Sequence, residues 1–147
     1  MPVRVWPRAP IIMDTIVKLL LELANTVEPV RGSRMAAAIV DKKGRILTIG
    51  TNKKKSHPFQ FKYSSNDDAI FLHAETECIL NYIKSKNKLK DLSKHTMYIV
   101  RARRTANGKE VIPGIAKPCK GCQRALATFG IKNVVYTTNS LAVESSI

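Results

Sequence analysis

Short apolar runs alternate with amphipathic stretches along most of this chain, and this alternation limits the folds that it can adopt. Residues 11–24 carry apolar side chains at the three-and-four spacing of one helical face, with charged side chains on the other face. Residues 35–40 form a continuous apolar run that is too short for a typical helix and is typical of a strand buried on both faces. Alternating helices and strands favour a sheet covered by helices. The sequence therefore predicts an α/β protein with three α/β/α layers and a mixed sheet.

Turn residues and helix-ending residues divide the rest of the chain into further elements. Residues 41–44 supply turn chemistry between the run at 35–40 and a second run at 45–50, which predicts an antiparallel hairpin. Residues 51–68 are polar without a sustained period, so a long loop near the functional site is expected there. The remaining pattern predicts a helix at 72–84, a strand at 96–100, a helix at 122–129 ended by Gly130, and a strand at 133–137.

The length of the chain indicates one domain, because 147 residues fit a single domain better than two. The expected division is an N-terminal extension at residues 1–10, a domain at 11–140 and a C-terminal tail at 141–147. No uninterrupted apolar run approaches the roughly 20 residues that cross a bilayer, so no membrane partner is expected. Three cysteines give no even-numbered disulfide framework, and the N-terminal region lacks a small-residue cleavage site. Both observations favour a cytoplasmic protein.

The charge of the chain is strongly positive, with 25 Lys and Arg against 11 Asp and Glu and a formal net charge of +14. The basic residues cluster at 53–55, between 84 and 94, and at 101–104. Such a surface attracts polyanions, which favours a phosphate-bearing partner. For any single basic run, a solvated surface that aids solubility is the alternative.

Three side chains that can bind a metal ion lie in two tight groups, each at the start of a predicted helix. His73 lies in the segment His-Ala-Glu, and Cys119 and Cys122 lie in Pro-Cys-Lys-Gly-Cys. Two cysteines three positions apart can bind one ion from a single helical turn, and the helix N-terminus favours their thiolates. One His and two Cys are the three protein ligands of a catalytic zinc site, which leaves its fourth position to water. Cys78 would complete a structural site instead, but it lies farther inside the helix of His73 and is expected to point into the core.

Glu75 follows His73 by two positions, which on a regular helix separates the two side chains by about 200°. Both can face one site if the helix begins here and both side chains reach beyond its N-terminal end. Taken singly, a Cys-x-x-Cys pair also fits redox chemistry, and a Glu in a first turn also fits the helix dipole. In combination, these residues favour a metal-dependent catalytic site with Glu75 beside the metal and outside its ligand set.

The order His-x-Glu followed by Pro-Cys-x-x-Cys resembles the zinc deaminase signature, and the chain is identified as a member of the cytidine deaminase superfamily. The resemblance covers most of residues 11–138. It implies a zinc cofactor held by His73, Cys119 and Cys122, and hydrolytic deamination of a nucleobase in which Glu75 moves the protons. Residues 101–117 depart from many relatives, which run almost directly from the third strand into Pro-Cys; a hairpin tip is expected at 107–108.

The resemblance also implies contacts with the substrate. Asn52 is similar to the asparagine that holds the sugar, and the backbone around Ala74 is expected to orient the base. The other candidate substrate-binding residues are His57 in the long loop, Lys53 as a phosphate contact and Tyr136 as a stacking ring.

The sequence leaves the substrate open. The dense positive charge favours cytosine within single-stranded nucleic acid as the leading hypothesis. The compact size favours a free nucleotide or nucleoside, such as cytidylate, deoxycytidylate or cytidine. A catalytically silent nucleic-acid-binding relative is disfavoured because Glu75 is present. Adenine or guanine stays open as the base because pocket shape decides this choice, and a homo-oligomer stays open because similar compact deaminases often assemble.

Overall fold

The computed structural model describes residues 3–6, 11–63, 71–86, 92–139 and 143–146. Within these residues, seven strands form one sheet with the order β1-β7-β6-β4-β2-β3, and β5 pairs with β4. The strands are β1 (Val3–Trp6), β2 (Arg34–Val40), β3 (Ile46–Thr51), β4 (Thr96–Arg104), β5 (Val111–Gly114), β6 (Asn133–Thr137) and β7 (Val143–Ser146). The helices are α1 (Ile11–Asn25), α2 (Pro58–Tyr63), α3 (Ala74–Lys86) and α4 (Lys120–Thr128).

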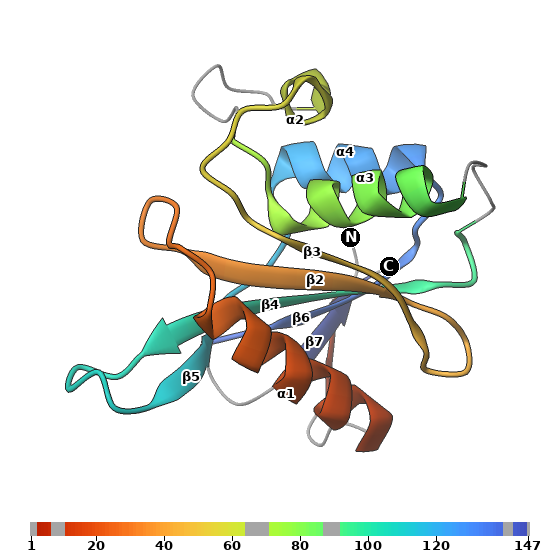
Figure 1. The fold of residues 1–147 in the computed structure, drawn as a ribbon. Helices are drawn as coiled ribbons and strands as arrows, with labels where there is room; N and C mark the ends of the chain where they lie inside the picture. Colours follow the sequence, from red (N-terminus) through yellow and green to blue (C-terminus); the bar gives the residue numbers. More distant parts are fainter. Residues whose placement is uncertain (1–2, 7–10, 64–70, 87–91, 140–142, 147) are drawn as a thin grey trace.

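The sheet lies between two helical layers (Figure 1). Helix α1 covers one face, α3 and α4 cover the other, and α2 contacts both α3 and α4. Strands β4 and β6 pair in parallel, whereas the other neighbouring strands pair antiparallel. The prediction of a three-layer α/β/α fold with a mixed sheet is therefore confirmed.

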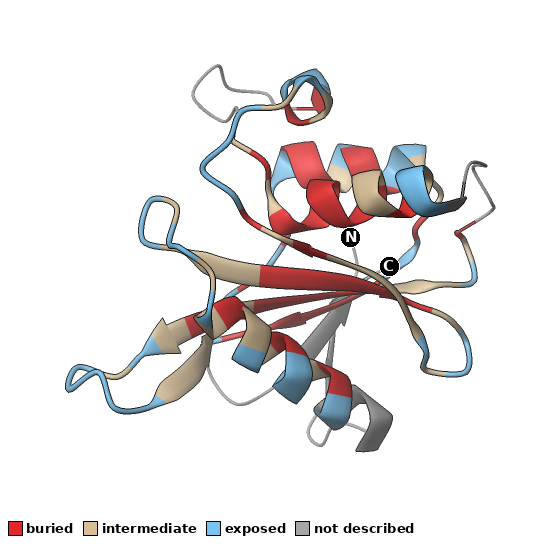
Figure 2. Cartoon of the chain, in the orientation of Figure 1, coloured by how far each residue is buried: buried red, intermediate tan, exposed pale blue. Residues whose placement is uncertain are grey.

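Two apolar clusters pack against opposite faces of the sheet. Ala36 and Ala38 of β2 pack with residues of α1, whereas Ala37 and Ile39 pack with residues of α3 and α4. Strand β2 is therefore buried on both faces, as its continuous apolar run predicts (Figure 2). This double burial fixes the central strands against which the helices of the site are packed.

Several local predictions agree with the structure. Strands β2 and β3 form the expected hairpin, and β6 spans the predicted residues 133–137. Helix α4 ends as predicted, because Gly130 follows its C-cap with φ 76°. The segment at 101–117 holds a hairpin of β4 and β5, and Gly108 adopts φ 70° in its turn. Strand β4 is longer than predicted, since pairing with β5 extends it to Arg104.

The expected long loop at 51–68 contains a short helix, α2, so this prediction was wrong in part; residues 64–68 lie outside the described residues. Six residues are too few to show a helical period. Side-chain packing holds α2 in place, because Gln60 and Tyr63 are buried and the rings of Phe59 and Tyr63 lie 5.4 Å apart.

The two ends of the chain add strands that the sequence analysis leaves outside the domain. Strand β1 pairs with β7, and β7 pairs with β6, which extends one side of the sheet. Each of these strands has four residues, which is too few to show a clear period in the sequence. Among the described helices, none combines the length and the apolar character that a membrane span needs.

Candidate metal centre and active site

His73 lies immediately before α3 and caps its first turn. The backbone N–H of Glu77 donates to the carbonyl of His73 at 3.0 Å, which is the first hydrogen bond of the helix. The backbone N–H of His73 donates to Oε1 of Gln60 at 3.1 Å. The side chain of His73 is therefore presented from a helix start that is anchored at both backbone groups.

Cys119 and Cys122 begin α4 in the same way. Cys119 is the N-cap residue, and its sulfur accepts a hydrogen bond from the backbone N–H of Cys122 at 3.4 Å. The carbonyl of Cys119 accepts from the N–H of Gln123 at 2.9 Å. Because N-terminal N–H groups and the helix dipole favour negative charge, this helix start suits a thiolate.

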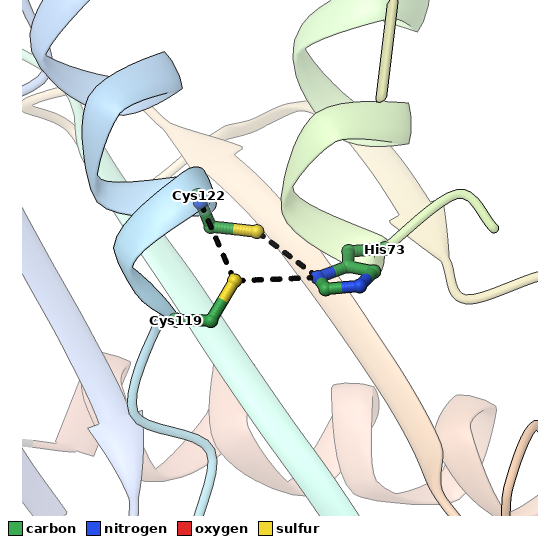
Figure 3. A group of neighbouring side chains, drawn as sticks. All are labelled: His73, Cys119 and Cys122. Atoms are coloured by element: carbon green, nitrogen blue, oxygen red, sulfur yellow. Dashed lines mark hydrogen bonds between the residues drawn. The ribbon is translucent and has the colours of Figure 1, made fainter. Parts of the chain in front are cut away.

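The two helix starts bring the three side chains together (Figure 3). Nδ1 of His73 lies 3.2 Å from the sulfur of Cys122 and 3.7 Å from the sulfur of Cys119. One ligand atom from each residue lies within 4.8 Å of the others, and within the described part of the chain no other group of His, Cys, Asp and Glu converges in this way. One nitrogen and two sulfurs thus face a common point.

The charges of these groups are strongly coupled. A hydrogen bond from Cys122, with a further contribution from His73, lowers the pKa of the Cys119 thiol to about 3. The same hydrogen bond and burial raise the pKa of the Cys122 thiol. The hydrogen bond with Cys119 raises the pKa of His73 against the effect of burial. The site therefore stabilises an anionic sulfur, which is the form that binds a metal.

Glu75 is the second residue of α3 and is 3% exposed. Its Oε1 atom is buried and has no hydrogen-bond partner among the described residues. Burial raises the pKa of this carboxyl, whereas the neighbouring charge of His73 lowers it. An unpaired buried carboxyl oxygen next to the metal-binding group is costly unless a ligand or water uses it.

Cys78 is not part of the group. It is fully buried in the core, where its sulfur lies 3.3 Å from the hydroxyl of Thr48, and burial raises the pKa of its thiol to about 12. This position agrees with the expectation that Cys78 packs in the core.

A cavity of about 320 Å³ opens beside His73 and is named here the His73 cavity. Its lining combines apolar, polar and basic side chains: Val30, Arg31, Ser33, Met35, Asn52, Phe71, Leu72 and His73. The Asn52 amide fixes one wall, because its Oδ1 accepts from the N–H of Met35 at 2.8 Å and its Nδ2 donates to the carbonyl of Ser33 at 2.9 Å. Of the residues that the sequence assigns to the substrate, Asn52 is the one in the lining of this cavity.

The other candidate substrate residues lie in different surroundings. Ala74 is fully buried at the start of α3, beside His73. Lys53 pairs with Glu77, with its Nζ 2.7 Å from Oε2 of Glu77. Nδ1 of His57 accepts from the N–H of Phe59 at 3.0 Å, at the start of α2.

Tyr136 is 1% exposed and packs in the apolar cluster beneath α3 and α4, so its ring has no open face for stacking a base. Its place in β6 explains this burial, since Val134 and Tyr136 share the strand face that packs in that cluster.

The sequence analysis missed Gln60, which is fully buried and accepts hydrogen bonds at Oε1 from His73 and from the hydroxyl of Thr76. A glutamine in a polar segment gives no periodic signal. The sole available hint was its place within a long loop expected to lie near the site.

The three convergent side chains fit a zinc ion. Zinc prefers nitrogen and sulfur ligands in tetrahedral geometry, and three protein ligands leave one position for water. Near this group, Oε1 of Glu75 is a buried polar atom without a hydrogen-bond partner among the described residues. Fold and site together define a zinc-dependent hydrolytic enzyme of α/β/α architecture.

Comparison with known proteins identifies the family. Residues 12–138 match the family described as the cytidine and deoxycytidylate deaminase zinc-binding region. The chain therefore belongs to this family of zinc-dependent hydrolytic deaminases, and the match includes the His/Cys/Cys group that is positioned to bind the metal.

Two solved structures share the fold. A dCMP deaminase from the cyanophage S-TIM5, in apo form, is 19% identical with a TM-score of 0.52, and the match covers 84% of this chain and 83% of that one. A cytidine deaminase from Burkholderia pseudomallei is 15% identical with a TM-score of 0.59, with 90% of each chain covered. No curated protein matches the chain.

Proposed function

We propose that the protein hydrolyses the exocyclic amine of cytosine in a free nucleotide or nucleoside, such as deoxycytidylate, cytidylate or cytidine. The observation that carries this proposal is the unpaired Oε1 of buried Glu75 beside the convergent His73, Cys119 and Cys122. The His73 cavity, at about 320 Å³, lies within the range of a site for one small molecule. The two solved structures that share the fold are named as a dCMP deaminase and a cytidine deaminase, which supports the same substrate class.

In the proposed reaction one water is consumed and one ammonia is released. His73, Cys119 and Cys122 would hold zinc, which when bound activates the attacking water as a Lewis acid. Glu75 takes a proton from the water and delivers it to the ring nitrogen next to the amine-bearing carbon. The water oxygen bonds to that carbon, the carbon–nitrogen bond breaks, and Glu75 passes the second proton to the departing amine.

We also propose roles in substrate binding for residues at or near the His73 cavity. We assign Asn52 to the sugar, because its position is fixed by two backbone groups, and the backbone of Ala74 to the base. Cavities of this kind use a few fixed polar groups to orient a ligand within an apolar lining.

Single-stranded nucleic acid is the second candidate substrate. Its support is the net charge of +14 together with the exposed side chains of Lys53, Lys54 and Lys55. A chain that neutralises several phosphates loses affinity steeply as salt rises, with a slope of about −0.7 per contact for single strands.

Ammonia release from cytidine, cytidylate, deoxycytidylate, single-stranded DNA and single-stranded RNA tests both candidates. Turnover of the free compounds with a shallow salt dependence is the expected result. Turnover confined to the polynucleotides, with a steep salt dependence, would replace the first candidate by the second. A Glu75→Gln variant is the negative control for contaminating deaminases.

A further inference from the structure

A second cavity, of about 410 Å³, lies next to the His73 cavity and is named here the lysine cavity. Its lining comes from the end of α1 with the residues that follow, and from the last residue of β3 with the segment after it: Leu23, Thr26, Val27, Glu28, Thr51, Asn52, Lys53, Lys54 and Lys55. Asn52 lines both cavities, so the two cavities are neighbours.

Backbone hydrogen bonds hold the lysine segment beside the metal-binding group. The N–H of Lys53 donates to the carbonyl of Leu72, and the N–H of Leu72 donates to the carbonyl of Lys55, each at 3.0 Å. An antiparallel bridge between Ser56 and Phe71 continues this pairing. Because His73 follows Leu72 directly, the segment is fixed next to the residue that presents Nδ1 to the two sulfurs.

The lysines of the cavity differ in their partners. Lys53 is paired with Glu77, whose side chain is 8% exposed. Lys54 and Lys55 are exposed and form no ion pair with any described residue. With Glu28 as the one acidic residue in the lining, the cavity keeps an excess of positive charge next to the active site.

We propose that the lysine cavity binds a phosphate group of the substrate, with Lys54 and Lys55 as its cationic contacts, while the cytosine occupies the His73 cavity. This proposal rests on the proposed function of the His73 cavity. Lysine is a common partner of phosphate and acts on it as a mobile point charge. The phosphate is either the terminal group of a free nucleotide or a backbone phosphate next to the target base.

The test compares deoxycytidylate with deoxycytidine, which lacks the phosphate. The ratio of their kcat/KM values is measured in the wild-type protein and in a Lys54→Ala/Lys55→Ala double variant. A Lys42→Ala/Lys43→Ala variant is the matched control, because it removes the same charge from exposed residues of the turn between β2 and β3.

The ratio is expected to fall about tenfold or more in the Lys54→Ala/Lys55→Ala variant, as for loss of a charge-assisted hydrogen bond. In the control it should stay within about twofold, since distant exposed charges are screened by salt. An unchanged ratio in the first variant, or an equal fall in the control, overturns the proposal. If the ratio falls in an Arg31→Ala variant alone, the phosphate lies in the His73 cavity, and this result also overturns the proposal.

Calorimetric titrations separate the two sources of phosphate without any turnover. The ligands are deoxycytidylate, deoxycytidine and a short single-stranded oligodeoxycytidylate. If the Lys54→Ala/Lys55→Ala variant binds deoxycytidylate more weakly than the wild-type protein does, the cavity binds a terminal phosphate. If this variant loses affinity for the oligonucleotide alone, the cavity binds backbone phosphates. Affinity lost for neither overturns the proposal. If no substrate releases ammonia, the proposed function fails, and these titrations still decide whether the lysine cavity binds phosphate.

Discussion

The side-chain oxygen of Gln60 accepts a hydrogen bond from the backbone N–H of His73 at 3.1 Å, from within the short helix α2. The same oxygen accepts a second hydrogen bond from the hydroxyl of Thr76 in the first turn of α3. N–H groups at a helix start have no partner within the helix, so a buried acceptor there determines how the helix begins. Gln60 therefore helps to set the position of the His73 imidazole.

Helix α2 also contacts α4, whose N-terminal end presents Cys119 and Cys122. The side chain of Arg124 donates to the carbonyl of Tyr63, and the ring centroids of Phe59 and Phe129 lie 5.9 Å apart. One six-residue helix thus contacts both of the helices whose N-terminal ends present His73, Cys119 and Cys122.

Replacement of Gln60 by alanine should weaken zinc binding by about tenfold and destabilise the fold by about 1–3 kcal/mol, because buried donors at the start of α3 lose their acceptor. Zinc affinity is measured by competition with a chelator, and stability by denaturant unfolding. Asn81→Ala is the matched control, since the Asn81 amide also lies on α3 and donates to the carbonyl of Ile49 at 2.9 Å. Equal zinc affinity in the two variants would show that Gln60 has a structural role alone.

The parts of the fold that the sequence predicts are those whose signal is local. Strand β2 is a continuous apolar run, and Gly130 marks the end of α4 by its own conformation. The convergence of His73, Cys119 and Cys122 could also be predicted, because their residue types are rare and their spacing within each group is short. Helix α2 and strands β1 and β7 were missed because each has only four to six residues, too few to show a period.

For individual side chains, too, the sequence gives the residue type but not the contacts that come from distant parts of the chain. The sequence marks Tyr136 as an aromatic ring but does not tell which face of β6 it occupies or that this face is covered. In the sequence, Gln60 is an ordinary polar residue. Its role as an acceptor for the backbone N–H of His73 is visible only in the structure. The sequence gives no sign that the charge of Lys53 is paired with Glu77, which the structure shows.

We expect the protein to bind about one zinc ion per chain, because three convergent side chains and one water complete a tetrahedral site. Replacement of Cys119 or Cys122 by alanine should abolish this binding. Elemental analysis of the purified proteins measures the metal content. Cys78→Ala is the control, because this cysteine is buried away from the group and its loss should leave the zinc content unchanged. Full zinc content in both ligand variants would exclude these thiols as ligands.

Replacement of Glu75 by glutamine should lower kcat for cytosine deamination by about 100- to 10,000-fold, the range for loss of a general acid-base group. Zinc content should be unchanged, because Glu75 is proposed to move protons outside the ligand set. Glu77→Gln, on the same helix and 6% exposed, is the control for loss of a buried carboxylate. A Glu75→Gln variant that keeps wild-type kcat would contradict the mechanism, and one that loses its zinc would place Glu75 among the ligands.

Replacement of Gly50 by alanine should disturb the start of α3, because β3 approaches that helix too closely for a side chain. A Cβ atom at Gly50 would lie 2.5 Å from the carbonyl oxygen of Ala74 and 2.8 Å from Cα of Cys78. Both are backbone atoms of the helix and cannot move aside as a flexible side chain could. We expect a destabilisation of about 3 kcal/mol, at the upper end for an overpacked core, together with weaker zinc binding, since Ala74 follows His73.

The contrasting variant for this prediction is Gly108→Ala in the hairpin of β4 and β5. Gly108 has φ 70° and no atom within 4 Å of an added Cβ, so this change tests backbone strain without a collision. It should cost about 1 kcal/mol and leave zinc affinity unchanged. Urea unfolding and chelator competition on both variants measure the two effects. If Gly50→Ala matched Gly108→Ala in stability and kept wild-type zinc affinity, close contact between β3 and α3 would not be what positions the metal ligands.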